Sequence, residues 1–182
     1  MLREGKADFS MPDLAAEAGV SFATPFNQFG SKAAIMQALS TRRIDTMQTR
    51  FAAAPSLTDT AERVLLAIDM AVAVMLEKPD VNRAVMGWLG TASPSPSQVW
   101  VRSMALWTLA LGAGEGLIAA RREQALVCLP RQLAVAFRGV LSFWTAGELP
   151  DEALATEARA VARTLLLGFS GWQPSASSSQ AV

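Results

Sequence analysis

The segment from Ser10 to Lys32 constrains the fold more than any other part of the chain, because it starts and stops helices at short intervals. Ser10 is a favourable N-cap residue, and Asp13 three positions later makes a variant of the capping box. Gly19 comes just after the last helical residue, where a left-handed conformation is needed. The pattern therefore predicts a short helix, Met11–Ala18, that is closed at both ends.

A second and a third helix are expected directly afterwards. Ser21 is placed to cap a helix over Phe22–Phe29, and Gly30 ends that helix. Ser31 is placed to cap a long helix over residues 32–54. Two short capped helices joined by a tight glycine turn form a helix-turn-helix, whose second helix can lie in the major groove of DNA.

The apolar side chains of this segment are expected to form a small core. Phe9 and Leu14 occupy the two positions of a hydrophobic staple. Val20 is expected to hold the two short helices together, and Phe29 is expected to pack inward, whereas Phe26 is not. Because a proline inside a helix removes a backbone hydrogen bond, the second helix is expected to be bent or partly 3₁₀ at its proline.

The rest of the chain has helical spacing of its apolar residues and no period-two alternation, which predicts an all-α fold. Gly112, Gly114 and Gly116 weaken the third of the remaining helices, and Pro94 and Pro96 indicate a loop before it. The segment Gly171–Val182, rich in Ser and Ala, is expected to be a disordered tail. The remaining expected helices are Leu57–Glu77, Asp80–Gly90, Gln98–Ala120, Pro130–Ala146, and one from Pro150 to about Gly171.

Composition narrows the class of protein. The 182 residues are 51% hydrophobic and 18% charged, which excludes a disordered chain. Formal net charge is zero, so the overall charge does not indicate a nucleic-acid binder. The absence of histidine, metal-ligand clusters, phosphate loops and nucleophile motifs argues against an enzyme. A single Cys128 and no signal peptide indicate a cytoplasmic protein, and the most apolar run, Val64–Leu76, is too short to span a bilayer.

The stretch from Ser10 to Lys32 resembles the DNA-binding domain of the TetR family. That domain has a short helix, the letters G-V-S, an aromatic-rich recognition helix, and F-x-S-K at the start of a long helix. The matching residues here are Gly19-Val20-Ser21, Thr24, Phe26-Asn27, Phe29 and Ser31-Lys32. The resemblance implies a TetR-like fold, in which residues 1–44 form the helix-turn-helix domain and residues 45–170 form a ligand-binding and dimerisation bundle.

In function, the resemblance implies a homodimeric repressor that binds operator DNA and releases it when a small apolar ligand binds, with no cofactor and no metal. It places Phe22 and Ala23 at base edges or thymine methyl groups, and Thr24 at a DNA-contacting hydroxyl. Phe26 and Asn27 replace an aromatic hydroxyl and an imidazole that usually touch phosphate. The DNA-binding residues implied in this way are Ser21, Phe22, Ala23, Thr24, Phe26, Asn27 and Lys32.

Lys32 has a physical argument of its own. A lysine at a helix N-terminus opposes the helix dipole at a cost of roughly 0.3–1 kcal/mol. A phosphate bound there reverses the sign of that effect, because the dipole and the lysine both attract it.

The family also begins with a long helix, of which only Met1–Gly5 resemble the last turn here. We therefore expect this chain to be N-terminally incomplete and to bind DNA less well than a version extended upstream.

Two further sets of residues are candidates in the C-terminal bundle. Methionine adapts to varied ligand shapes, and tryptophan offers flat area and one N–H donor. The last two helices have broad apolar faces that can pair with their twofold mates. For both sets, the alternative is an ordinary internal core. The candidates for the ligand pocket are Met70, Val74, Met86, Trp88, Met104, Trp107 and Leu111. The candidates for the dimer interface are Phe137, Val140, Leu141, Trp144, Val161, Leu165 and Phe169.

Asp69 interrupts the most apolar run, but helical geometry puts it on one face with Asp59, Glu62 and Glu77, so it is expected to be solvated.

An alternative function with the same fold is also open: a dimeric small-molecule or partner-binding protein that no longer binds DNA. Salt-dependent binding to a palindromic site separates these two readings.

Overall fold

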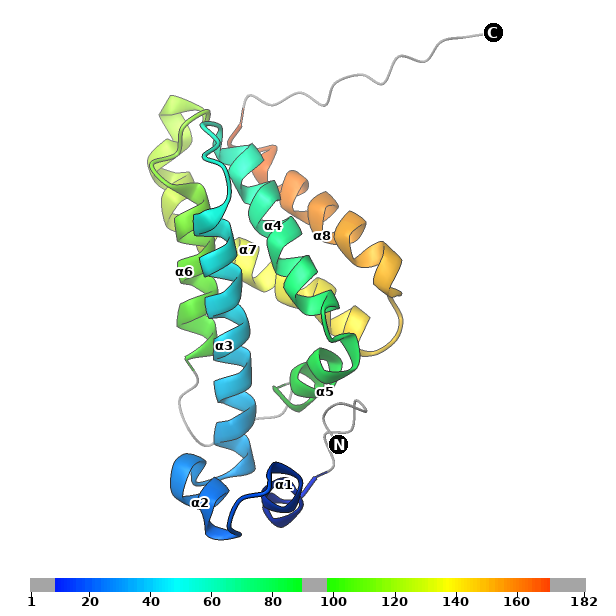
Figure 1. Ribbon diagram of the computed structural model, residues 1–182. Helices are drawn as coiled ribbons and strands as arrows, with labels where there is room; N and C mark the ends of the chain where they lie inside the picture. Colours follow the sequence, from blue (N-terminus) through cyan, green and yellow to red (C-terminus); the bar gives the residue numbers. More distant parts are fainter. Residues whose placement is uncertain (1–8, 90–97, 171–182) are drawn as a thin grey trace, which may run out of the picture.

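The computed structural model describes residues 9–89 and 98–170, and all of the regular structure in these ranges is helical (Figure 1). The expected loop around Pro94 and Pro96 and the expected tail lie outside the described residues. The all-α expectation is confirmed, since the described ranges contain an isolated bridge between Leu117 and Ser170 but no strand. The elements are α1 (Met11–Ala18), α2 (Ala23–Phe29), α3 (Lys32–Ala53), α4 (Thr60–Leu76), α5 (Pro79–Leu89), α6 (Val99–Leu111), a 3₁₀ turn (Ala119–Arg121), α7 (Arg122–Thr145) and α8 (Asp151–Leu166).

The first three helices are delimited by local contacts, most of them as expected. The backbone N–H of Asp13 donates to Ser10 Oγ over 3.2 Å, and Ser10 N donates to Asp13 Oδ2 over 3.0 Å, which completes a capping box at α1. Gly19 has a φ of 66° and ends α1 in the left-handed region. Ser31 Oγ accepts from the N–H of Ala34 over 3.2 Å and caps α3.

The start of α2 differs from the expectation. Ser21 does not cap the backbone; its Oγ lies 2.7 Å from Thr24 Oγ1, and the helix begins at Ala23. Pro25 is the third residue of α2, where a backbone N–H has no partner within the helix in any case. For that reason α2 is a regular α-helix, and the expected bend is absent.

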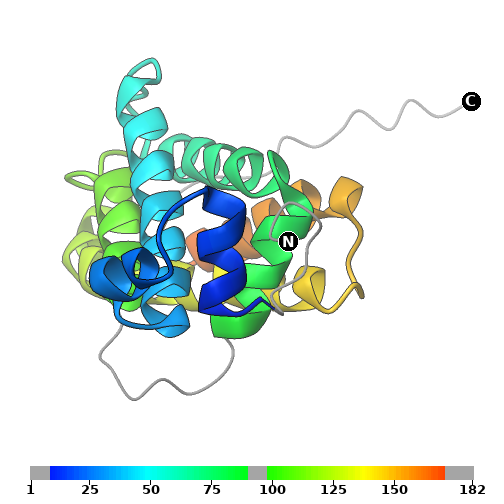
Figure 2. The ribbon, with the colours of Figure 1, turned by 60° about the horizontal axis from the view of Figure 1, so that its bottom comes forward.

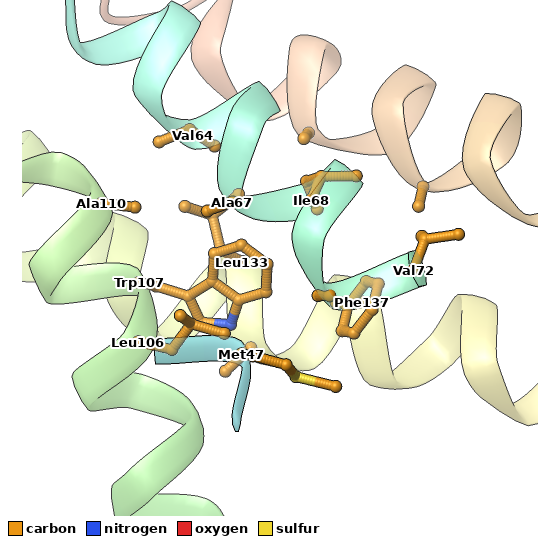
Figure 3. Close-up of a cluster of buried hydrophobic side chains, with 14 of the residues drawn as sticks. Met47, Val64, Ala67, Ile68, Val72, Leu106, Trp107, Ala110, Leu133 and Phe137 are labelled. Carbon is orange, nitrogen blue, oxygen red and sulfur yellow. The ribbon is translucent and has the colours of Figure 1, made fainter. Parts of the chain in front are cut away.

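The main core lies among α3, α4, α6, α7 and α8 (Figure 1). Trp107 of α6 is fully buried at its centre, in contact with the ring of Phe137 at a centroid distance of 5.6 Å (Figure 3). Val64 and Ile68 of α4 face it from one side and Leu133 of α7 from another. Burial of this apolar area from several helices at once is the main source of stability of such a bundle.

The helix expected over Gln98–Ala120 is shorter in the structure than the sequence predicted. It ends at Leu111 and not at Ala120, because Gly112, Gly114 and Gly116 have φ angles of 57°, 80° and 83°. Residues in that conformation cannot continue a right-handed helix. The turn they form is fixed to the start of α4, where Thr60 N donates to Glu115 O over 2.8 Å.

Pro130 was expected to open a helix, and this was wrong. Pro130 lies inside α7, which begins at Arg122. A proline inside a helix costs roughly 3 kcal/mol through the lost hydrogen bond and the clash of its ring. The residues before it offset that cost, because Ala125 and Leu129 are both fully buried against the core.

The segment Ala119–Thr145, which contains α7, is long and apolar enough to cross a membrane by length and composition, with a mean hydropathy of 1.3. In the described structure α7 packs against α5, α6 and α8, and its buried residues include Leu133, Phe137 and Trp144. Part of its apolar composition is accounted for by this position in the core of the bundle.

Candidate DNA-binding surface and ligand cavity

The helix-turn-helix lies at one end of the molecule, and α2 presents most of its residues to solvent (Figure 1). Phe22 is 64% exposed and Phe26 is 42% exposed, and their ring centroids are 5.8 Å apart. Of the other residues implied to contact DNA, Ser21, Ala23 and Asn27 are exposed and Thr24 is half-buried. The structure thus brings six of these residues together on one outward surface at the start and middle of α2.

The seventh implied residue, Lys32, is half-buried at the N-terminus of α3. Its Nζ lies 4.6 Å from the centre of the Phe9 ring, close enough for a cation–π interaction. Phe9 itself is 4% exposed. The contact therefore holds the lysine beside the first turn of α3, next to the backbone N–H groups that would attract an anion.

Two residues expected in the core of this domain are exposed. Val20 is 42% exposed and Phe29 is 41% exposed. The buried residues of this end of the molecule are Phe9, Met36 and Val85, which form one cluster with Leu14 and Trp88 packed against it. The staple pair Phe9 and Leu14 thus packs as expected, whereas none of the described residues covers Val20 and Phe29 enough to bury them.

A cavity lies between α3, α5, α6 and α7, with Met75 at the end of α4 also in its wall. About 590 Å³ of space, including the opening to solvent, is free of protein atoms. The wall is mainly apolar and includes Ile44, Met47, Val85, Leu106 and Phe137. A mainly apolar, concave wall with a few polar groups is typical of small-molecule sites.

Two of the seven candidate ligand residues, Met86 and Trp107, line this cavity. Val74 and Leu111 are fully buried in the core and do not reach it. Met104 and Met70 are half-buried, and they too lie outside its lining. Trp88 packs instead against the cluster around Phe9, on the side of the helix-turn-helix.

The polar residues of the cavity were missed by the sequence analysis, which searched for methionine and tryptophan. Ser40 and Arg43 of α3, Asn82 of α5, and Arg138 of α7 all line it. A signal was present for Arg138, because Ala134, Arg138 and Leu141 share one face of a helix and the other two residues are apolar. A charged residue on an apolar face is the pattern that could have found this site.

Four of the residues expected at a dimer interface are buried within the chain. Phe137, Val140, Leu141 and Trp144 are at most 8% exposed, so they have little area to offer a second chain. Val161, Leu165 and Phe169 are half-buried and pack against the same core. For the α7 residues, the alternative of an internal core is the one that the structure supports.

The outer face of α7 and α8 is apolar in a different set of residues. Phe143 is 58% exposed and Val135 is 51% exposed. A shallow groove between the two helices is lined by residues that include Gly139, Phe143 and Val161. Asp69, on α4, is partly exposed as expected, and its carboxylate pairs with Arg159 of α8.

Comparisons with known proteins agree with this arrangement. Residues 1–39 match the family model of the bacterial regulatory proteins of the tetR family. The crystal structure of a TetR transcriptional regulator from Rhodococcus sp. RHA1 is similar to this chain, with a TM-score of 0.69 and 22% sequence identity. The likeness covers 91% of this chain and 90% of that chain. No curated protein matched the sequence.

The match over residues 1–39 covers α1, α2 and the start of α3, and the structural likeness shows that the whole chain has the fold of such a regulator. The N-terminal helix-turn-helix is therefore similar to the DNA-binding segment of the tetR family, and the chain has a TetR-like fold.

Proposed function

We propose that this protein is a cytoplasmic homodimeric repressor that binds operator DNA. A small molecule with an apolar body releases it from that DNA. The observation that carries the proposal is the continuity of α3. This helix starts at Lys32 beside the recognition helix and lines the cavity with Ser40, Arg43 and Met47. From Lys32 to Arg43 the rise along the helix is about 16 Å. A displacement of α3 at the cavity is therefore carried to the DNA-binding end.

Helix α5 supplies a second connection between the two sites. Val85 and Leu89 line the cavity, and both also belong to the cluster formed with Phe9 and Met36. Figure 2 shows α1 between α2 and α5 at this end of the molecule. A ligand that moves α5 outward would disturb the packing beneath α1. In a dimer this would change the separation of the two recognition helices, which must match two half-sites on DNA.

For the DNA contacts, the exposed start of α2 supports base reading by Phe22 and Ala23, whose apolar surfaces suit thymine methyl groups. Ser21 and Thr24 supply hydroxyl groups at the same end. Lys32 and the first N–H groups of α3 would bind a backbone phosphate. Phe26 offers ring area but no hydroxyl.

The homodimer is proposed through the outer face of α7 and α8. Exposed Phe143 and Val135 and the groove at Val161 provide apolar area that a twofold mate could cover. A Cβ added to Gly139 would meet no atom within 4 Å, so a second helix has room to approach closely there. This places the contact on the opposite side of α7 from Phe137 and Leu141, which the core already uses.

The test is selection of binding sites by the purified protein from a random pool of duplex DNA, followed by titration of the selected site at several salt concentrations. The expected site is a palindrome, because a twofold dimer reads two half-sites. Lys32→Gln should weaken binding and reduce the salt slope by about one per half-site. Phe22→Ala should weaken it about tenfold. Phe143→Glu should yield a monomer in sedimentation and lose the palindromic site.

Thr49→Ala, at the far end of the same α3, is the matched control and should bind like the wild type, because Thr49 is exposed and its hydroxyl donates back to Asp45 O of the same helix. If the wild type selects no sequence and its binding does not weaken with salt, the repressor proposal is wrong. The dimeric ligand-binding protein without DNA would then be the better reading.

A further inference from the structure

We propose that the ligand of the cavity is an organic carboxylate with an apolar body, held by Arg43 and Arg138. This inference rests on the proposed function, in which the same cavity binds the releasing molecule, and it adds the charge of that molecule. The sequence alone predicted a small apolar ligand, because the candidate lining residues were all methionine, tryptophan or aliphatic.

The apolar wall of the cavity determines that most of the ligand is apolar. Met47, Leu106 and Phe137 face the cavity, and the indole of Trp107 lies among them (Figure 3). These are apolar and aromatic surfaces from α3, α6 and α7, and removing an alkyl or aryl group from water against them is favourable. Methionine side chains at Met47 and Met86 can adapt to its shape.

The polar groups of the same cavity are, in contrast, almost all hydrogen-bond donors. Trp107 is fully buried, and its Nε1–H has no hydrogen-bond partner among the described residues. In Figure 3 the nitrogen of the indole lies on the side of Met47, which also lines the cavity. Ser40, 6% exposed, also has an unpartnered Oγ within the described part of the chain. A buried donor left without an acceptor is costly, so a bound molecule with acceptor atoms would be stabilised here.

Arg43 is held in place by a buried amide. Asn82 is 2% exposed, and its Nδ2 donates to Met75 O over 2.7 Å and to Val74 O over 3.2 Å. Those two bonds turn its Oδ1 toward Arg43, whose Nε donates to it over 2.9 Å. The guanidinium of Arg43 is thus oriented by a neutral group, and its charge is not neutralised by that contact. Asn82 acts as a positioning residue for the arginine.

The charge of Arg138 is compensated by its neighbours even less than that of Arg43. Its Nη1 lies 3.5 Å from Met86 Sδ, and a thioether sulfur is a weak acceptor. Burial lowers the pKa of Arg138 from its ordinary value, because removing the guanidinium from water disfavours its charged form. Arginine still remains charged at neutral pH, so the cavity keeps a partly desolvated cation.

No carboxylate of the described residues lines the cavity or pairs with either arginine. The ion pairs of these ranges join other arginines to acids elsewhere, such as Arg102 to Asp45 and Arg159 to Asp69. The cavity therefore places two guanidinium groups and two unpartnered polar groups beside an apolar wall, and none of the described residues supplies an anion for them. A carboxylate supplies it, since its two oxygens match the donor fork of a guanidinium.

The test uses three probes of the same chain length that differ in head group: octanoate, octanamide and octylammonium. Their binding to the full chain without DNA is measured by calorimetry. Octanoate should bind about tenfold or more tightly than octanamide, because a hydrogen bond to a charged group is stronger than one between neutral groups. Octylammonium should bind more weakly than either.

Arg138→Gln and Arg43→Gln should each reduce the preference for octanoate over octanamide by about tenfold, and Arg138→Lys should retain part of it. Arg131→Gln is the matched control, because Arg131 lies two turns before Arg138 on α7 and is exposed outside the cavity. It should leave the preference unchanged. The thermal unfolding of each variant, compared with that of the wild type, shows that the variant is folded.

Equal affinity for octanoate and octanamide, or no saturable binding of octanoate, overturns the inference. So does an unchanged preference in both glutamine variants. These outcomes are separate from the test of the repressor, because no DNA is present. A neutral ligand that releases DNA would leave the repressor intact and remove the carboxylate, whereas carboxylate binding without DNA binding would do the reverse.

Discussion

The two ends of this molecule treat large apolar side chains in opposite ways. In the helix-turn-helix, Phe22, Phe26 and Phe29 are 64%, 42% and 41% exposed. In the bundle, Trp107 and Trp144 are both 0% exposed. The chemistry of the side chain does not explain this contrast, because all five residues are aromatic. Their surroundings do, since the two tryptophans face the interior where several helices meet, whereas the recognition helix is packed on one side only.

The polar contacts differ in the same way. Those of the helix-turn-helix span three residues, as in Ser10 with Asp13 and Ser21 with Thr24. The bundle has local contacts too, but it adds contacts between distant parts of the chain, as in Arg63 Nη2, which donates to Leu109 O over 2.9 Å. The bundle therefore depends also on contacts that exist only once it has formed. The difference predicts which substitutions the fold will tolerate.

The largest effect is expected at Trp144. Its side chain is fully buried, its Nε1 donates to Asp151 Oδ1 over 2.7 Å, and Arg83 lies 4.5 Å from the centre of its ring. Trp144→Ala should lower the free energy of unfolding by about 3–5 kcal/mol, because it leaves a cavity and removes the hydrogen bond to Asp151. Phe22→Ala should change it by less than about 0.5 kcal/mol. Urea unfolding of both variants measures the difference.

Comparable losses for these two variants would show that the helix-turn-helix depends on Phe22 for stability, and the contrast between the two ends would be wrong. Because Phe22→Ala is also expected to weaken DNA binding, the same variant separates stability from function.

An intermediate loss of stability is expected when either of two glycines in a left-handed conformation is replaced by alanine. Gly19 has a φ of 66° and open space where a Cβ would stand. Gly116 has a φ of 83°, and a Cβ there would come within 2.1 Å of Asp59 Oδ2. That carboxylate caps α4, where Asp59 Oδ1 accepts from Glu62 N over 3.0 Å. Gly19→Ala should therefore cost about 1–2 kcal/mol, from backbone strain alone.

Gly116→Ala should cost about 2–4 kcal/mol, because the strain is joined by the loss of the cap when Asp59 moves away. Thermal unfolding of the two variants side by side is the measurement. Asp59→Ala supplies the control, since it should remove most of the excess cost of Gly116→Ala in a double variant. Equal costs at Gly19 and Gly116 would contradict this account.

The smallest effect concerns pH and is confined to the helix-turn-helix. Hydrogen bonds from the Ser10 hydroxyl and the Ser10 backbone N–H hold the pKa of the Asp13 carboxyl below its ordinary value. A carboxyl whose pKa is lowered by folding stabilises the fold above its ordinary pKa, and the contribution is lost as the pH falls through the folded value. Asp13→Asn should therefore unfold at a slightly lower temperature than the wild type at neutral pH.

Once the pH has fallen through the lowered pKa of the folded chain, the two proteins should converge, because Asp13 is then protonated in both the folded and the unfolded chain. Thermal unfolding across this range is the measurement, and Glu152→Gln in the exposed first turn of α8 is a control for general charge effects. A difference that persists unchanged in acid would show that the Asp13 carboxylate does not carry the effect.

Sequence reasoning worked best where the signals and their partners are neighbours. Ser10, Asp13 and Gly19 fix α1 by contacts within the same few residues, and the structure confirms each of them. It failed at Pro130 and at Gly112, where a local rule competed with burial or with a turn bonded to another helix. It also missed Arg43 and Arg138, because their importance depends on an apolar cavity built from helices far apart in the chain.

The sequence by itself determined the helix-turn-helix, the all-helical class and the family resemblance, because caps, glycine turns and helical periodicity act over a few residues. Only the tertiary structure decided which apolar faces became core. It buried Phe137 and Trp144 within the chain and left Phe143 outside. It also joined Arg43 and Arg138 at one cavity. The physical reason is that burial depends on which helices meet, and a periodic pattern shows that a face is apolar without showing what covers it.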